Sequence, residues 1–290
     1  MAATDDDLDD PSARREQQEE EEKGQTPQKG YETILEQQIL AGVTELERPA
    51  SGLFLSGLSA GLDVSLSLLL MAAMRTLTAG ELPHVVAEIL VANMYSAGFL
   101  FVVLGRSEMF TEHTTIAVLP VLDGRASLRQ LGRLWGLIYA ANMIGAAAFA
   151  AFAAFIGPKL GVIEPAAFGE IASGVVNHPG WVILLSAVLA GWLMGLLTWL
   201  VSASRDTISQ IFVVWLVTFG IGFLHLHHSI VGSAEVLAGV FSGLGATLAD
   251  FWIVLFWTTL GNIAGGVVFV ALLKWGHAHS AQRGRFPSEK

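Results

Sequence analysis

The chain has 290 residues, of which 53% are hydrophobic and only 14% are charged, against about 25% charged in an average soluble domain. Residues 1–23 hold ten acidic and three basic side chains, which is −7 of the formal net charge of −10. Cysteine is absent, which excludes disulfides, thiolate nucleophiles and cysteine metal sites. The rest of the chain is nearly neutral and strongly apolar, which indicates an integral membrane protein.

The N-terminal 48 residues divide into two segments. Residues 1–30 are charged, rich in glutamine and without apolar periodicity, so we expect a disordered acidic cytoplasmic tail. In residues 31–48 the pattern changes, and Leu35, Ile39 and Val43 recur at helical spacing between Glu and Gln. This stripe predicts an amphipathic helix that lies along the membrane interface.

Long apolar windows follow, and a helix needs about 20 such residues to cross a bilayer. They predict an all-α membrane protein whose transmembrane domain, residues 49–276, has six transmembrane helices, with a cytoplasmic tail at 277–290. The predicted spans are 52–74, 85–104, 131–156, 180–201, 208–223 and 252–275. Two weaker apolar stretches, 115–122 and 233–244, each follow a polar cluster and are too short to span alone.

The basic residues predict an orientation. If both termini are cytoplasmic, 14 of the 16 lysines and arginines lie on the cytoplasmic side, and Arg75 and Lys159 are the exceptions. We therefore expect a multi-pass protein of the bacterial inner membrane with both termini in the cytoplasm.

The two halves of the chain share a pattern. The sequence around Asn142 in the third window matches the sequence around Asn262 in the sixth, and polar interruptions near Thr111 and Ser229 follow the second and fifth windows. Three helices repeated once, with a break at the matching place, predict an inverted repeat in which helices 2 and 5 are broken.

Polar residues at these two breaks are candidate functional groups, because loops at membrane depth must face protein or a wet cavity. An imidazole such as His228 can donate a proton near physiological pH, and protonation of an anion removes much of its desolvation cost. Thr111 offers a hydroxyl to the same permeant. The helix N-termini after each break add positive potential.

Other readings of the polar residues remain open. A metal site formed by His225, His227 and His228 is a less favoured alternative, because their spacing does not place all three side chains on one helical face. Further polar residues are assigned to interfacial positions (His84, His113) or to buried structural or pathway positions (Asp63, Glu88). Nucleotide-loop, hydrolase and metalloprotease motifs are absent, so we expect no enzyme activity, cofactor or nucleic-acid partner.

Three short motifs in order resemble the formate/nitrite transporter family over about residues 35–275: Met109-Phe110-Thr111, His228-Ser229-Ile230 and the stretch 260–266. The resemblance implies an aquaporin-like fold assembled as a homopentamer, with one pore per subunit. It also implies apolar constrictions, formed by Tyr95, Phe99, Met109, Phe110 and Ile221. Thr111 and His228 would flank a central site, and we place Ser229 and Asn262 on the same pathway.

The chain resembles a divergent branch of that family. Relatives in that family carry a lysine before the fourth helix, and residues 173–178 of this chain contain none. They have an acidic residue where this chain has His227, and an asparagine where it has Gly232. We predict a channel or transporter for a small monovalent weak-acid anion or its conjugate acid, with proton exchange at His228. A conduit for a small neutral solute is the alternative that the missing lysine would permit.

Overall fold

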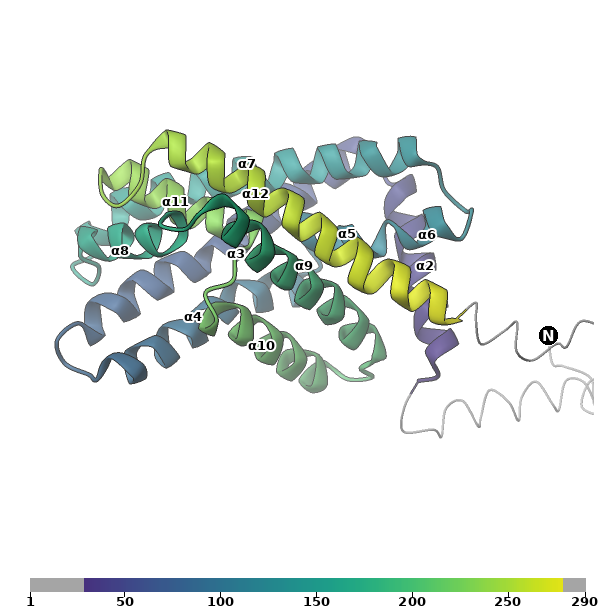
Figure 1. Ribbon diagram of the computed structural model, residues 1–290, viewed down its shortest axis with the longest axis horizontal. Coiled ribbons are helices and arrows are strands. Elements are labelled where there is room, and N and C mark those ends of the chain that lie inside the picture. Colours follow the sequence, from purple (N-terminus) through teal and green to yellow (C-terminus); the bar gives the residue numbers. More distant parts are fainter. Residues whose placement is uncertain (1–28, 279–290) are drawn as a thin grey trace, which may run out of the picture.

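The computed structural model describes residues 29–278, which form helices and contain no strand within that range (Figure 1). The predicted tail at 1–30 lies almost wholly outside the described residues, and so do residues 279–290. The helices are α2 (Tyr31–Glu47), α3 (Ala50–Thr78), α4 (His84–Gly105), α5 (Phe110–Ile116), α6 (Leu119–Leu122), α7 (Leu128–Lys159), α8 (Pro165–Val176), α9 (Gly180–Ala203), α10 (Thr207–Phe223), α11 (Ser229–Ser242), α12 (Leu248–Gly266) and its π-helical continuation η2 (Val267–Leu272).

The predicted spans and breaks correspond to these helices with one difference in number. Within the described residues, five helices are long and apolar enough to cross a membrane: α3, α4, α7, α9 and the helix Leu248–Ala278. The predicted fifth span is α10, which has only 17 residues, so the count of six remains a prediction. The two weaker apolar stretches form α5 with α6, and α11, which confirms that helices 2 and 5 are each interrupted.

Helix α8 is an element that the sequence analysis did not predict. Its 12 residues include Gly169 and Gly174, and it is too short to resemble a span. Pro165 occupies its first turn, where a missing N–H is tolerated. The helix buries Phe168 and Ile171 against the bundle. This segment is therefore a packed helix at one end of the molecule and not a loop.

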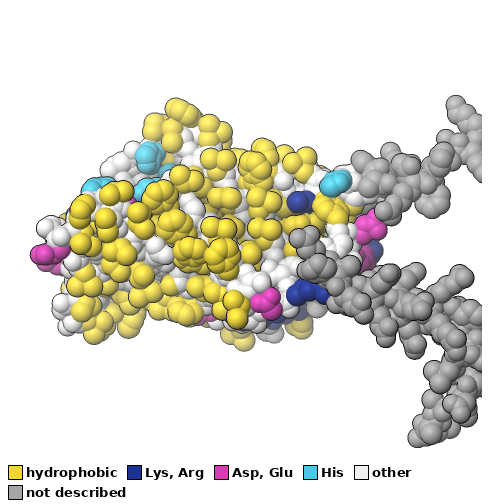
Figure 2. All heavy atoms as spheres, turned by 90° about the horizontal axis from the view of Figure 1, so that it is seen from below, with side chains coloured by type: hydrophobic (Ala, Val, Ile, Leu, Met, Phe, Trp, Pro, Cys, Tyr) yellow, Lys and Arg dark blue, Asp and Glu magenta, His cyan; other side chains and the backbone are white. Residues whose placement is uncertain are grey.

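The surface is apolar between the two ends of the bundle. Figure 2 shows hydrophobic side chains over most of one face, with acidic side chains toward both ends and basic ones gathered toward one end. Large apolar side chains such as Phe152, Phe155, Trp252 and Phe256 are exposed. Contiguous apolar surface of this kind is stable in lipid or against another subunit, and not in water.

The two described ends of the chain meet at one end of the bundle (Figure 1). The Tyr31 hydroxyl donates a hydrogen bond of 2.6 Å to the Lys274 carbonyl. The Tyr31 ring also lies 4.8 Å from the Trp199 ring and 4.5 Å from the His277 ring. Helix α2 therefore joins the ends of α9 and α12, and which side of the membrane they occupy remains a prediction.

The predicted internal repeat is confirmed by matching helix crossings. A Cβ added at Gly61 of α3 would lie 2.3 Å from the carbonyl oxygen of Asn142 on α7. A Cβ added at Gly191 of α9 would lie 2.3 Å from the carbonyl oxygen of Asn262 on α12. Each half therefore needs a glycine for the same close approach of two backbones.

Gly61→Ala is expected to lower stability by about 1–3 kcal/mol, because the methyl group would push α3 from the α7 backbone. Gly136→Ala is the matched control on a membrane-spanning helix, since its added Cβ has no atom within 4 Å among the described residues. Thermal unfolding of the detergent-solubilised protein measures both. Equal melting temperatures for the two variants would contradict the close-packing explanation.

Candidate functional site

The two half-helices that precede the breaks end in the same way. Arg106 after α4 and His225 after α10 adopt left-handed conformations, with φ of 58° and 50°. The next N–H groups, of Ser107 and Leu226, each bond to a carbonyl five residues earlier, at 3.1 and 3.0 Å. This is the Schellman type of helix end. Non-glycine residues in that conformation carry strain of about 1–3 kcal/mol, which persists where the surrounding structure enforces it.

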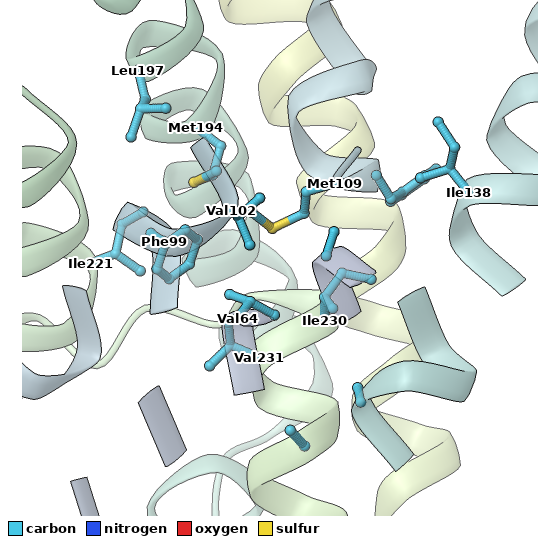
Figure 3. Close-up of a cluster of buried hydrophobic side chains, with 14 of the residues drawn as sticks. Val64, Phe99, Val102, Met109, Ile138, Met194, Leu197, Ile221, Ile230 and Val231 are labelled. Carbon is cyan, nitrogen blue, oxygen red and sulfur yellow. The ribbon is translucent and has the colours of Figure 1, made fainter. Parts of the chain in front are cut away.

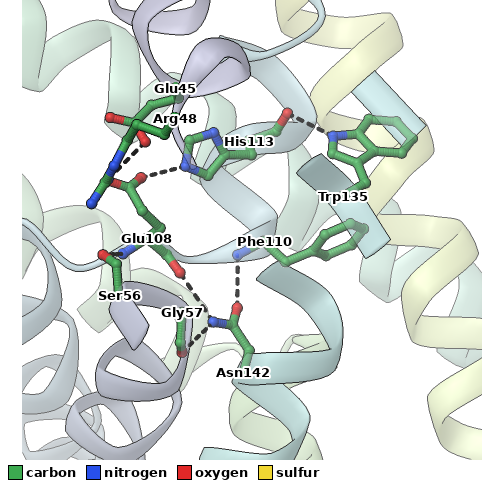
Figure 4. Close-up of polar contacts among 9 residues, drawn as sticks. All are labelled: Glu45, Arg48, Ser56, Gly57, Glu108, Phe110, His113, Trp135 and Asn142. Atoms are coloured by element: carbon green, nitrogen blue, oxygen red, sulfur yellow. Dashed lines mark hydrogen bonds and ion pairs between the residues drawn. The ribbon is translucent and has the colours of Figure 1, made fainter. Parts of the chain in front are cut away.

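The first break is held by Asn142 of α7 (Figure 4). Its side-chain oxygen accepts the N–H of Phe110, the first residue of α5, at 2.8 Å. Its side-chain nitrogen donates to the Gly57 carbonyl at 2.7 Å and to the Glu108 carbonyl at 3.0 Å. One amide therefore satisfies two backbone groups of the interrupted helix, the Phe110 N–H and the Glu108 carbonyl, and its bond to the Gly57 carbonyl ties the break to α3.

Asn262 of α12 holds the second break by the same three bonds. Its oxygen accepts the N–H of Ser229, the first residue of α11, at 2.8 Å. Its nitrogen donates to the Ala187 carbonyl at 2.9 Å and to the His227 carbonyl at 3.1 Å. Asn262 is fully buried, so this predicted pathway residue directs its amide at the backbone that positions the break.

Thr111 and His228 meet where the two breaks approach each other. The Thr111 hydroxyl lies 2.9 Å from Nε2 of His228, and both side chains are buried. The Val231 N–H donates to Nδ1 of His228 at 3.3 Å, because the imidazole caps α11. In the neutral ring Nε2 therefore carries the proton and donates to the threonine oxygen. Two predicted site residues, far apart in sequence, form one hydrogen-bonded pair.

Apolar rings and side chains surround this pair. Phe99 lies edge-on to the His228 imidazole, with ring centroids 5.3 Å apart. Figure 3 shows Met109 pointing toward Val102 and Phe99 in the buried cluster. Phe110, in contrast, packs its ring against Tyr139 of α7 at 4.8 Å. Of the residues expected to form constrictions, Phe99 contacts the central histidine and Phe110 is directed toward α7.

A cavity of about 80 Å³ reaches His228 from the end of the bundle that holds α8. Tyr95 and Ile221 line it, as two of the expected constriction residues. Its basic lining residue, Arg75, is bonded to Glu88 of the same cavity. Arg75 is thus already paired, and an anion entering here finds little unpaired positive charge.

The three neighbouring histidines have different partners. His227 is fully hydrogen-bonded, since Nδ1 lies 2.9 Å from the Ser186 hydroxyl and Nε2 donates to the Val175 carbonyl at 3.0 Å. His225 is largely exposed, 3.4 Å from Glu88. Among residues 29–278 no three side chains are placed to hold a metal ion, so the metal-site alternative has no ligand set there.

A second polar cluster, which the sequence analysis missed, lies at the first break (Figure 4). Glu108 accepts from Arg48 at 3.0 Å and lies 2.5 Å from Nε2 of His113. His113, expected at the interface, is instead buried, and its carbonyl accepts the Trp135 indole N–H at 3.0 Å. The sequence signal for this cluster was an acidic residue in the break, Glu108, followed by His113 in the next helix.

Asp63 and Glu88 bond to neighbouring segments, which agrees with the buried structural position that was one of the two expectations for them. Asp63 accepts from Ser107 in the first break at 3.0 Å. Glu88 pairs with Arg75 of α3. Glu235 was not anticipated: it is buried on α11 and lines the same cavity as His228.

Comparisons with known proteins agree with this architecture. The family model described as formate/nitrite transporter matches residues 32–276. The inner membrane protein YfdC of Escherichia coli (strain K12) is 33% identical over 236 residues, 80% of this chain and 74% of that protein. A probable formate transporter of Methanothermobacter thermautotrophicus is 32% identical over 209 residues, 67% of this chain and 76% of that protein.

Two solved structures share the fold. A chain described as an FNT family ion channel superposes with a TM-score of 0.74 at 22% identity, covering 84% of this chain and 98% of that one. A pentameric formate channel with formate bound gives a TM-score of 0.65 at 21% identity, covering 79% of this chain and 98% of that one.

Proposed function

The chain belongs to the formate/nitrite transporter family, and from this premise we propose that it carries a small monovalent weak-acid anion together with a proton. The observation that carries the proposal is the contact of 2.9 Å between Thr111 and His228, buried where the two breaks meet. Relatives include a probable formate transporter and nitrite transporters, and formate and nitrite are the cargoes we propose here.

The proposed step is a proton transfer at His228. The protonated imidazole gives its proton to the anion, which becomes the neutral acid, and the ring returns to the neutral form bonded to Thr111. The neutral acid passes the apolar side chains at a lower desolvation cost than the anion. Water in the cavity then returns a proton to the ring. The Ser229 hydroxyl is buried without a partner among the described residues and can also donate to the permeant.

The proposed constrictions lie on both sides of this pair. Tyr95 and Ile221 close the cavity side, while Phe99 and Met109 pack near the first break. We propose Asn262 as a positioning residue rather than a permeant contact, since its amide is occupied by backbone groups. Phe110 contributes through its packing on α7.

The proposed assembly is a homopentamer in the bacterial inner membrane with both termini cytoplasmic. One fold relative is described as a pentameric channel. The exposed apolar side chains between the two ends of the bundle support contact with lipid and neighbouring subunits. The pore would then lie within each subunit, because Thr111 and His228 come from one chain.

Uptake of formate or nitrite by liposomes that contain the purified protein tests the proposal. At constant total formate, the rate is expected to rise as the external pH falls, by up to about tenfold per pH unit, because one proton accompanies each anion. A dye inside the vesicles should report acidification. Uptake that is independent of pH would contradict proton coupling, and urea uptake without formate uptake would favour the neutral-solute alternative.

A further inference from the structure

Glu235 is an acid inside the protein that the transport step does not use. Glu235 is only 6% exposed, and its carboxyl group takes part in no hydrogen bond or ion pair with the described residues. It follows His228 by seven positions on α11, with Gly232 between them, and all three line the same cavity. Seven residues are two helical turns, so one face of α11 leads from Glu235 to His228.

The Tyr95 hydroxyl is a second unused group in this cavity. Tyr95 is 4% exposed and lines the cavity, and its hydroxyl has no partner among the described residues. The position of the residue is fixed, because a Cβ added at Gly222 would lie 2.8 Å from its Cβ and its carbonyl accepts from Ser67 at 2.6 Å. A buried hydroxyl held in place without a partner costs free energy, unless a ligand bonds to it.

These two groups favour a neutral ligand over an anion. Glu235 offers carboxyl oxygens as acceptors, and Tyr95 offers an O–H donor. Arg75, which could have balanced the charge of an anion, is bonded to Glu88. An undissociated acid carries a hydroxyl donor and a carbonyl or nitroso acceptor on one small group, which matches an acceptor and a donor on the protein.

The surface of α11 between these groups and the central pair has free space at Gly232. A Cβ added at Gly232 would meet only Val175, at 3.9 Å. A small acid between Glu235 and Tyr95 therefore has space along this face of α11 toward His228.

We propose that Glu235 and Tyr95 form a subsite in the cavity that binds the undissociated form of the permeant acid. The O–H of the acid donates to a carboxyl oxygen of Glu235, and its other oxygen accepts from the Tyr95 hydroxyl. The inference rests on the proposed function and names the form that the permeant has on this side of His228, whose proton transfer concerns the anion on the other side.

The test compares liposome uptake of formate by Glu235→Ala, Tyr95→Phe and the unaltered protein at fixed pH. Each variant is expected to raise KM about tenfold, since each loses one hydrogen bond to the acid, with a much smaller change in maximal rate. Glu170→Ala is the matched control, an exposed acid on the wall of the same cavity. Its KM should not change.

Glu235→Gln separates the proposed role from that of a simple negative charge. The glutamine oxygen still accepts a hydrogen bond, so KM for formate should stay within about threefold of the original value. The double variant Glu235→Ala with Tyr95→Phe should raise KM less than the product of the two single effects, because both groups bond to one molecule.

Unchanged KM in both single variants that elute as folded protein would overturn the subsite. So would uptake of methylammonium that Glu235→Gln abolishes, which would indicate a cation site. If the unaltered protein transports no formate, the proposed function fails separately. Saturation-transfer NMR of formate on the solubilised protein then decides: binding lost in Glu235→Ala supports the subsite, and binding retained overturns it.

Discussion

His228→Ala is expected to reduce proton-coupled formate uptake by about 10- to 100-fold, the effect of losing a hydrogen bond to a charged group of about 1.5–3 kcal/mol. The substitution removes the proton carrier and leaves the Thr111 hydroxyl without its partner at 2.9 Å. The pH dependence of the remaining uptake should also flatten. Stopped-flow uptake into liposomes, with intravesicular pH recorded together, measures both results.

Two controls separate this role from a general loss of structure. His225→Asn changes an exposed histidine of the same break, and asparagine tolerates its left-handed backbone; uptake should be retained. Thr111→Val keeps the shape of the side chain but removes the hydroxyl, and it should lower uptake while Thr111→Ser restores it. Uptake by His228→Ala equal to that of His225→Asn would contradict a central role for the imidazole.

The main features of the fold follow from the sequence, because apolar length and polar interruption are local properties of a membrane chain. The windows around α3, α4, α7, α9 and α12 are visible for that reason, and so are the two breaks. The repeat was detectable because the same Asn and Gly spacing recurs in α7 and α12. Helix α8 was missed because its 12 residues with two glycines are indistinguishable from a polar-apolar loop.

The site could be predicted only in part. Thr111 and His228 were found as polar residues at breaks and through family motifs, but their contact depends on how the two halves pack. Glu235 escaped notice because it lies inside an apolar stretch. Tyr95 was assigned to an apolar constriction, so the sequence analysis did not consider its hydroxyl as a binding group. The role of Asn262 depends on the partners of its amide, which only the structure identifies.

Asn142→Leu and Asn262→Leu are expected to be destabilising by about 2–4 kcal/mol each, because each leaves one N–H and one carbonyl of a break unpaired, at about 1–2 kcal/mol per group. Leucine has similar volume, so the loss comes from hydrogen bonds and not from a cavity. The repeat predicts nearly equal losses, because each amide bonds to one N–H and two carbonyls. Thermal unfolding in detergent measures the difference.

Asn93→Leu provides the matched control. Its nitrogen bonds to the Ile89 carbonyl within its own helix and its oxygen accepts from the Trp215 indole at 3.0 Å, so its loss should be only about 1 kcal/mol. Equal melting temperatures for the variants at 93, 142 and 262 would contradict the assignment of the two buried asparagines. If they hold the breaks, Asn262→Leu should also lower uptake in protein that remains folded, because the carbonyl of His227 and the N–H of Ser229 flank His228 and would lose the bonds that position the imidazole.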